Sequence, residues 1–147
     1  MTRDYAPLKK QLEDEEARVP YAYQDQFGLW TIAIGRLVDK KKGGHLRNSE
    51  MDFMLDNDVK EIELEVLHDY PWAVRLSQPR LDALLQMRFQ LGKLGLSRFA
   101  NFLGRMEDGV WDQAASEIDN SIWAHQTPDR AHRLAKQILT DMYQFKA

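Results

Sequence analysis

Hydrophobic residues recur every three or four positions along most of the chain, which is the spacing of an amphipathic helix. The clearest run consists of Met51, Leu55, Val59, Ile62 and Val66. It predicts a helix over residues 49–69, roughly 30 Å long, and Ser49 with Asp52 resembles a capping box at its start. Further helices are predicted over residues 4–16, 77–92, 97–109 and 111–119, and from Thr127-Pro128 onwards.

Residues 21–38 have a different pattern, which favours β-structure. Residues 26–28 are predicted to form a hairpin loop, and residues 30–34 have the composition of a strand. Because side chains alternate along a strand, Trp30 is expected on the core side and Thr31 on the opposite side, which carries small residues. That second side is suited to a surface that a ligand approaches.

These elements predict one domain of the α+β class, mostly α, with two lobes. The small β lobe covers about residues 17–48, and the helix over residues 49–69 joins it to the other lobe. That other lobe is helical, covers about residues 71–147, and includes the N-terminal helix.

Composition narrows the classes of function. The chain has no cysteine, and its four histidines are scattered, so no metal site or other cofactor is predicted. A net charge of −3 argues against nucleic-acid binding. No apolar run approaches the roughly 20 residues that span a bilayer, so no stable membrane association is expected. The N-terminus lacks the apolar core of a signal peptide, which predicts synthesis in the cytoplasm.

The candidate chemistry is concentrated in three side chains. Glu16 and Asp25 are separated by eight residues, and Thr31 follows after five more. Inverting glycosidases place two carboxyl groups about 6.5–9.5 Å apart, one as a general acid and the other to activate a water. Acids at helix ends and hairpins are usually solvated surface groups, so the spacing alone leaves both interpretations open.

The surroundings of the two acids predict different roles for them. Glu16 follows three other acids near a helix C-terminus, and both features favour its protonated form. Asp25 lies beside the predicted hairpin loop, where it stays ionised more readily and could orient a water. The hydroxyl of Thr31 is a second candidate ligand for that water.

The chain resembles the phage-type lysozymes, the T-even phage lysozyme family of glycoside hydrolases. The active-site signature is found in Glu16 and in Tyr23-x-Asp25-x-x-Gly28-x-Trp30-Thr31-Ile32-Ala33-Ile34-Gly35. Distal matches are Phe89-Gln90-Leu91-Gly92, Phe99, Trp111-Asp112-x-Ala114-Ala115 and Trp123-x-x-Gln126-Thr127-Pro128-x-Arg130-Ala131. The resemblance covers nearly the whole chain and implies a lysozyme-like fold with two lobes.

The resemblance also implies an activity and its site. Family members hydrolyse the β-1,4 bond between N-acetylmuramic acid and N-acetylglucosamine in peptidoglycan, with inversion and without a metal. Glu16 matches the general acid, and Asp25 and Thr31 match the residues that hold the water. The positions that match the lining of the saccharide cleft are Leu37, Phe89 and Gln90. Arg130 matches an arginine that pairs with the catalytic acid.

By the same resemblance, we expect a monomeric endolysin that lyses the host cell. It would be made in the cytoplasm of the host bacterium and released to the periplasmic wall through a holin-type pore. Apart from the resemblance, Phe89 is expected in the core, Gln90 could satisfy backbone groups, and Trp111 and Trp123 would be packing residues.

Three departures from the family pattern leave a second reading open. Ala17 and Ala33 replace glycines, and Arg36 stands where a histidine often occurs. The alternative is a catalytically impaired relative that binds peptidoglycan or belongs to a phage particle. A lytic transglycosylase would need only the acid, so retention of both Asp25 and Thr31 argues against that third possibility.

Overall fold

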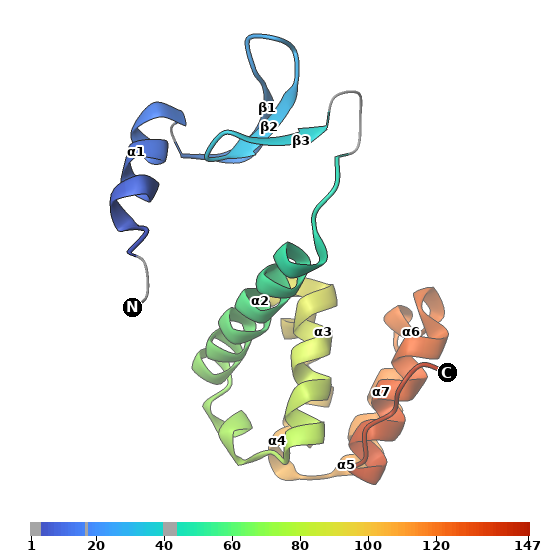
Figure 1. Cartoon of the computed structure of the whole chain (residues 1–147). Helices are drawn as coiled ribbons and strands as arrows, with labels where there is room; N and C mark the ends of the chain where they lie inside the picture. Colours follow the sequence, from blue (N-terminus) through green and yellow to red (C-terminus); the bar gives the residue numbers. More distant parts are fainter. Residues whose placement is uncertain (1–3, 17, 40–43) are drawn as a thin grey trace. The chain divides into compact units, whose positions relative to one another are not determined.

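The computed structural model describes residues 4–16, 18–39 and 44–147, and these residues are mostly helical with one small sheet. The α+β class predicted from the sequence is confirmed. The chain divides into an N-terminal unit, residues 1–54, and a helical unit, residues 55–147 (Figure 1). Each unit is described by itself. The predicted lobe boundaries, and the place of the N-terminal helix in the helical lobe, stay predictions. Ala17 lies outside the described residues.

The N-terminal unit begins with helix α1, Ala6–Glu16, two residues later than predicted. Asp4 Oδ1 accepts a hydrogen bond from the backbone N–H of Ala6 at 2.9 Å, which satisfies a free donor at the helix start. Three antiparallel strands follow in the order β1-β2-β3, with bounds Val19–Gln24, Trp30–Ala33 and Arg36–Asp39.

The β1–β2 hairpin has the predicted three-residue loop, residues 26–28. The N–H of Gly28 donates to the carbonyl of Asp25 at 3.0 Å, and the N–H of Asp25 donates to the carbonyl of Leu29 at 2.9 Å. Gly28 has φ +74°, as the left-handed position of this loop type requires. Asp at the first turn position and Gly at the last are favoured in such a turn, so local chemistry accounts for the loop.

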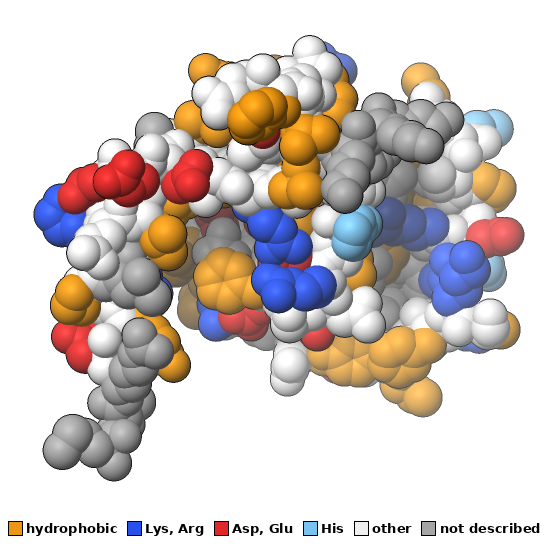
Figure 2. All heavy atoms as spheres, turned by 45° about the horizontal axis from the view of Figure 1, so that its top comes forward, with side chains coloured by type: hydrophobic (Ala, Val, Ile, Leu, Met, Phe, Trp, Pro, Cys, Tyr) orange, Lys and Arg blue, Asp and Glu red, His pale blue; other side chains and the backbone are white. Residues whose placement is uncertain are grey.

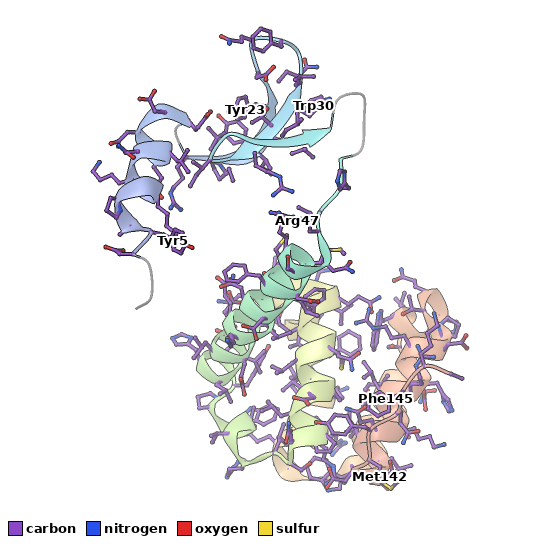
Figure 3. All side chains as sticks on the ribbon, in the orientation of Figure 1. Tyr5, Tyr23, Trp30, Arg47, Met142 and Phe145 are labelled. Carbon is purple, nitrogen blue, oxygen red and sulfur yellow. The ribbon has the colours of Figure 1, made fainter. Side chains whose placement is uncertain are left out.

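The prediction that Trp30 lies on the buried side of β2 was wrong. Thr31 is buried, with 5% of its surface exposed, whereas Trp30 is 38% exposed. Trp30 is labelled in Figure 3, and Figure 2 shows hydrophobic side chains, in orange, at several places on the surface. Exposure does alternate between these neighbouring side chains of β2, but the buried side is the one that carries Thr31. No hydrophobic side chain is buried among the described residues of the N-terminal unit, so the side of β2 that carries Trp30 has no apolar core of its own.

Two residues at the turn between β2 and β3 have backbone angles in the left-handed region. Gly35 has φ +66°, and Ala33 has φ +59°. A Cβ in this region is crowded by the backbone, at a cost of roughly 1–2 kcal/mol per residue. The alanine noted as a departure from the family pattern therefore occupies a position that favours glycine on backbone grounds alone.

Helix α2, Asn48–Asp69, begins with an ion-pair cluster around Glu50. Glu50 accepts from the backbone N–H of Arg47 at 2.8 Å and from the Arg47 guanidinium at 2.7 Å, and it also pairs with Arg36 of β3. The hydrogen bonds from Arg47 and Arg36 lower the pKa of Glu50 to about 2. The predicted capping box of Ser49 and Asp52 is replaced, because Glu50 reaches back to the N-terminal backbone.

The helical unit contains the remaining elements and a single buried core. The elements of this unit are the end of α2, a 3₁₀ turn over Pro71–Arg75, and helices α3 (Gln78–Ser97), α4 (Ala100–Asp108), α5 (Trp111–Asp119), α6 (Ile122–Gln126) and α7 (Pro128–Thr140). The core includes Val66, Leu84, Met87, Leu96, Phe102, Met106, Ile118, Leu134 and Ile138. The 3₁₀ turn and α6 were not predicted.

Two glycines mark helix ends as the sequence predicted. Gly109 caps α4 with φ +72°. Gly92, with φ +73° and ψ 178°, interrupts α3, and helical structure resumes beyond it as far as Ser97. Among the described residues, no helix combines the length and the apolar composition needed to cross a membrane.

The two distal tryptophans are packing residues, as expected. Trp123 is buried and meets the Phe99 ring edge-on, with ring centroids 6.4 Å apart. Arg80 lies over the ring of Trp111, 3.9 Å from its centroid. Both contacts lie within the helical unit and hold its helices together.

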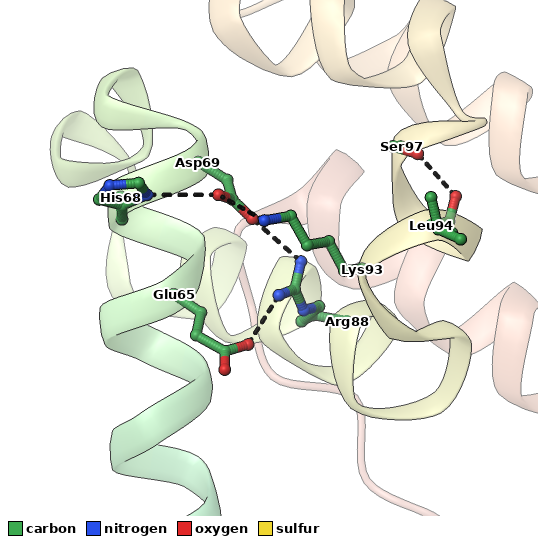
Figure 4. A network of polar contacts seen from close by, with 7 residues as sticks. All are labelled: Glu65, His68, Asp69, Arg88, Lys93, Leu94 and Ser97. Carbon is green, nitrogen blue, oxygen red and sulfur yellow. Dashed lines mark hydrogen bonds and ion pairs between the residues drawn. The ribbon is translucent and has the colours of Figure 1, made fainter.

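A buried cation joins α2 to α3. Arg88 is 5% exposed and donates to Glu65 at 2.6 Å and to Asp69 at 3.3 Å (Figure 4). Lys93, just beyond the Gly92 kink, also approaches Asp69, at 3.5 Å. Because a buried guanidinium without partners is costly, these carboxylates determine where α3 packs on the last turns of α2.

Candidate active site

One pocket in the N-terminal unit brings together four of the predicted site residues. Glu16, Asp25, Thr31 and Leu37 all line this pocket, which has a volume of about 650 Å³. They come from the end of α1, from the β1–β2 hairpin and from strands β2 and β3. Other residues of the wall are Glu15, Tyr23, Gln24, Gln26, Phe27, Leu29 and Gly35.

Asp25 is held by the hairpin through one carboxylate oxygen. Its Oδ1 accepts from the backbone N–H of Phe27 at 2.8 Å and of Leu29 at 2.9 Å. In the part of the chain that the structure describes, no hydrogen bond reaches the other oxygen, Oδ2. The turn therefore fixes the direction of the carboxylate and leaves one oxygen as an acceptor for a ligand or a water.

Thr31 is oriented by the same backbone segment. Its hydroxyl donates to the carbonyl of Leu29 at 3.2 Å, and that carbonyl also accepts from the N–H of Asp25 at 2.9 Å. A hydroxyl that donates in this way retains lone pairs that accept. The backbone of Leu29 thus hydrogen-bonds both side chains: its N–H donates to Asp25, and its carbonyl accepts from Thr31. One residue therefore positions the free acceptor groups of both.

Glu16 is the last residue of α1, and its side chain lies against Gly35. A Cβ built on Gly35 would be 2.5 Å from Glu16 Oε2, so any larger residue at this position would force the carboxyl group to shift. Glu16 is exposed and, among the described residues, forms no ion pair or hydrogen bond. It is free to protonate or bind a group that enters the pocket.

The acidic run before Glu16 is partly neutralised by cations. Glu13 pairs with Arg18 at 2.7 Å, and Asp14 pairs with Lys10 at 2.9 Å. Two of the three acids that precede Glu16 therefore have cationic partners, although exposed ion pairs are weak and screened by salt. Glu15 remains, and it also lines the pocket.

Phe89 and Arg130 line a second, mostly apolar pocket, which lies in the helical unit and has a volume of about 470 Å³. Phe89 is 51% exposed, so the expectation that it belongs to the core was wrong. Gln90 is exposed. Because these three residues belong to the helical unit and Glu16 to the other, the pairing of Arg130 with Glu16 and a shared saccharide cleft stay predictions.

Several residues of the pocket wall were not predicted from the sequence as site residues; they include Glu15, Tyr23, Gln24, Gln26, Phe27 and Leu29. A signal for Tyr23 was available, since a residue opposite Thr31 on the paired strand is its neighbour, and Tyr23 pairs with Thr31 in the register of β1 and β2. Glu15 could not be distinguished from the other acids of its run without the helix orientation.

A carboxyl at a helix end, a second carboxylate held by a turn, and a hydroxyl beside it are the groups that a glycoside hydrolase needs. The comparison with known proteins agrees with this class. The family model described as phage lysozyme matches residues 13–137, and the chain belongs to the phage lysozyme family. It is a lysozyme-type glycoside hydrolase, and the resemblance noted in the sequence is confirmed.

Individual relatives are similar over most of the chain. Probable T4-type lysozyme 2 of Dictyostelium discoideum is 29% identical, over 86% of this chain and 90% of its own length. Probable T4-type lysozyme 1 of the same organism is 29% identical, over 90% and 94%. The pre-baseplate central spike protein Gp5 of Enterobacteria phage T4 is 26% identical, over 86% of this chain and 26% of that protein.

Proposed function

We propose that this protein is a muramidase that hydrolyses the β-1,4 bond between N-acetylmuramic acid and N-acetylglucosamine in peptidoglycan, with inversion. The observation that carries the proposal is the shared pocket of Glu16, Asp25 and Thr31. A lysozyme-type enzyme acts on peptidoglycan, and these three groups supply a proton donor and two acceptors for a water.

The proposed mechanism assigns one task to each group. Glu16 donates its proton to the glycosidic oxygen as the bond to the anomeric carbon breaks. A water held by Asp25 Oδ2 and the Thr31 hydroxyl attacks the anomeric carbon from the opposite face, and Asp25 takes up its proton. The new C–O bond then has the inverted configuration. Leu37 would contact the sugar within the same pocket, and Phe89 and Gln90 would contact it from the helical unit.

The biological role that we propose is host-cell lysis by a phage endolysin. A monomeric enzyme made in the bacterial cytoplasm would reach the periplasmic wall through a holin-type pore. The family match and the two lysozymes of Dictyostelium discoideum support the activity. Release through a separate pore and the monomeric state are further parts of the proposal.

A second candidate is a relative with impaired turnover in a phage particle. Two observations favour it: the similarity to a spike protein of a phage and the strained Ala33 beside the site. Intact spacing of all three site residues favours the active enzyme, because a purely structural protein does not need a proton donor and a water-holding pair together.

Product analysis tests the proposal and separates the alternatives. Purified peptidoglycan sacculi are incubated with the protein, and the soluble fragments are examined by mass spectrometry and by proton NMR early in the reaction. We expect N-acetylmuramic acid reducing ends in the α configuration. A 1,6-anhydro end would identify a transglycosylase, the β anomer would exclude inversion, and an absence of fragments would favour the impaired relative.

A further inference from the structure

Phe27 is an aromatic residue of the pocket wall to which the proposed mechanism gives no task. It lies in the loop of the β1–β2 hairpin and lines the same pocket as Glu16, Asp25 and Thr31. It is 77% exposed, so it contributes little apolar burial to the N-terminal unit. The Phe27 ring lies in the wall of the proposed carbohydrate pocket and is not needed for folding. It is therefore available to contact a ligand.

The backbone of Phe27 is fixed relative to the proposed water-holding acid. Its N–H donates to Asp25 Oδ1 at 2.8 Å, and the turn is closed on either side by the bonds of Gly28 and Leu29 to Asp25. The point from which the ring extends is therefore set by the carboxylate that would orient the water. The backbone anchor of the ring is thus fixed beside the reacting groups, within reach of a ligand in the pocket.

The geometry points to Phe27 as a sugar-binding residue, whose ring stacks on the apolar face of a pyranose in the pocket. Equatorial substituents leave the axial C–H groups of a β-linked N-acetylated sugar exposed on its faces. The face of an aromatic ring is electron-rich and attracts such C–H groups, and both surfaces lose water on contact. The inference deepens the proposed function and rests on it, because a sugar must enter this pocket.

The polar groups of the same wall favour a sugar over an apolar ligand. Gln24 and Gln26 each carry an amide, and Gln24 Nε2 donates to the carbonyl of Gly28 at 3.4 Å, which leaves its Oε1 as an acceptor. Amide and carboxylate groups around the edge bind hydroxyl and acetamido groups, while a ring covers the face. Together these groups match an amphipathic sugar ring.

Binding to peptide-free glycan tests the inference without depending on turnover. The protein carries Glu16→Gln to stop hydrolysis, and the probe is a soluble oligosaccharide of alternating N-acetylglucosamine and N-acetylmuramic acid from which the stem peptides have been removed. Affinity is measured by NMR titration for Phe27 and for Phe27→Ala, Phe27→Leu and Phe27→Tyr. Tyr21→Ala is the matched control, an exposed aromatic of β1 that is not among the pocket residues.

We expect Phe27→Ala and Phe27→Leu to weaken binding about 3- to 10-fold, the size of a single aromatic contact, and Phe27→Tyr to retain it within about twofold. Tyr21→Ala should bind normally, and none of the Phe27 variants should change the thermal unfolding midpoint. Equal affinity for Phe27→Ala, full affinity for Phe27→Leu, or a loss confined to peptide-bearing sacculi would overturn the stacking.

Kinetics in the Glu16 background distinguish this inference from the proposed function. Phe27→Ala should raise KM and leave kcat within about twofold, as expected when an interaction is made equally in the bound and transition states. If the protein binds the oligosaccharide through Phe27 but releases no fragments, the proposed hydrolase activity is refuted and the stacking of Phe27 on the sugar is supported. If Phe27→Ala cleaves the substrate with an unchanged KM, the stacking of Phe27 is refuted and the proposed hydrolase activity is supported.

Discussion

Substitution of Gly35 by alanine should impair the proposed active site through one contact. The added Cβ would lie 2.5 Å from Glu16 Oε2, 2.6 Å from its Cδ and 2.8 Å from its Cγ. Since ordinary contacts of a Cβ begin at 3.4 Å, the carboxyl group must withdraw by about 1 Å or rotate out of the pocket. Glu16 is exposed, so it moves without disturbing a packed core.

The expected effect on catalysis is larger than the effect on stability. A displacement of about 1 Å in a catalytic group costs on the order of 100-fold in rate, so we expect kcat/KM to fall about 10- to 100-fold. The left-handed backbone at Gly35, with φ +66°, adds a strain of about 1 kcal/mol for any residue with a Cβ.

The assay compares Gly35→Ala with Gly109→Ala, which carries the same strain without the contact. Gly109 has φ +72°, and its added Cβ would meet Trp111 at an ordinary 3.5 Å. Activity is measured as dye release from labelled sacculi, and the folded fraction by circular dichroism. If folded Gly35→Ala retains activity within about twofold of folded Gly109→Ala, then the position of Glu16 beside Gly35 does not matter for catalysis.

Three further predictions concern stability. Ala33→Gly should raise the free energy of unfolding by about 0.5–1 kcal/mol, because it removes a Cβ from a left-handed position; a lower unfolding midpoint would contradict this. Arg88→Met should destabilise the helical unit by about 2 kcal/mol in denaturant unfolding, since it leaves the carboxylates of Glu65 and Asp69 without the guanidinium that they share; no change would show that the ion pairs contribute nothing net. Glu50→Gln should lower the unfolding midpoint near neutral pH. Because the pKa of Glu50 is lowered from 4.5 to about 2 in the folded state, its contribution is present above about pH 4.5 and is lost as the pH falls toward 2. The gap between wild type and Glu50→Gln should therefore close over that range, and a gap that widens in acid would refute the assignment.

Elements defined by local chemistry could be predicted from the sequence. The loop at residues 26–28 follows from the preference of Asp25 and Gly28 for their turn positions, and α5 has the predicted bounds, Trp111–Asp119. Gly92 was recognised as a helix end because a left-handed residue breaks the helical bond pattern. Each of these signals depends only on a residue and its immediate neighbours.

Features that depend on distant residues could not be predicted in this way. Which side of β2 is buried depends on what covers the sheet, and Thr31 rather than Trp30 proved to be buried. The start of α2 is capped by Glu50 because Arg36 of β3 holds the same carboxylate. The role of Phe27 in the pocket wall likewise required the fold of the hairpin over the end of α1.

The most direct test of the central claim is the kcat/KM of Glu16→Gln relative to wild type on outer-membrane-permeabilised Gram-negative cells. Loss of a general acid typically costs 10²–10⁴-fold, so we expect a reduction of about 1,000-fold. The unfolding midpoint should stay the same, because Glu16 makes no hydrogen bond or ion pair among the described residues. A wild-type protein that clears the cells no faster than Glu16→Gln would contradict the account.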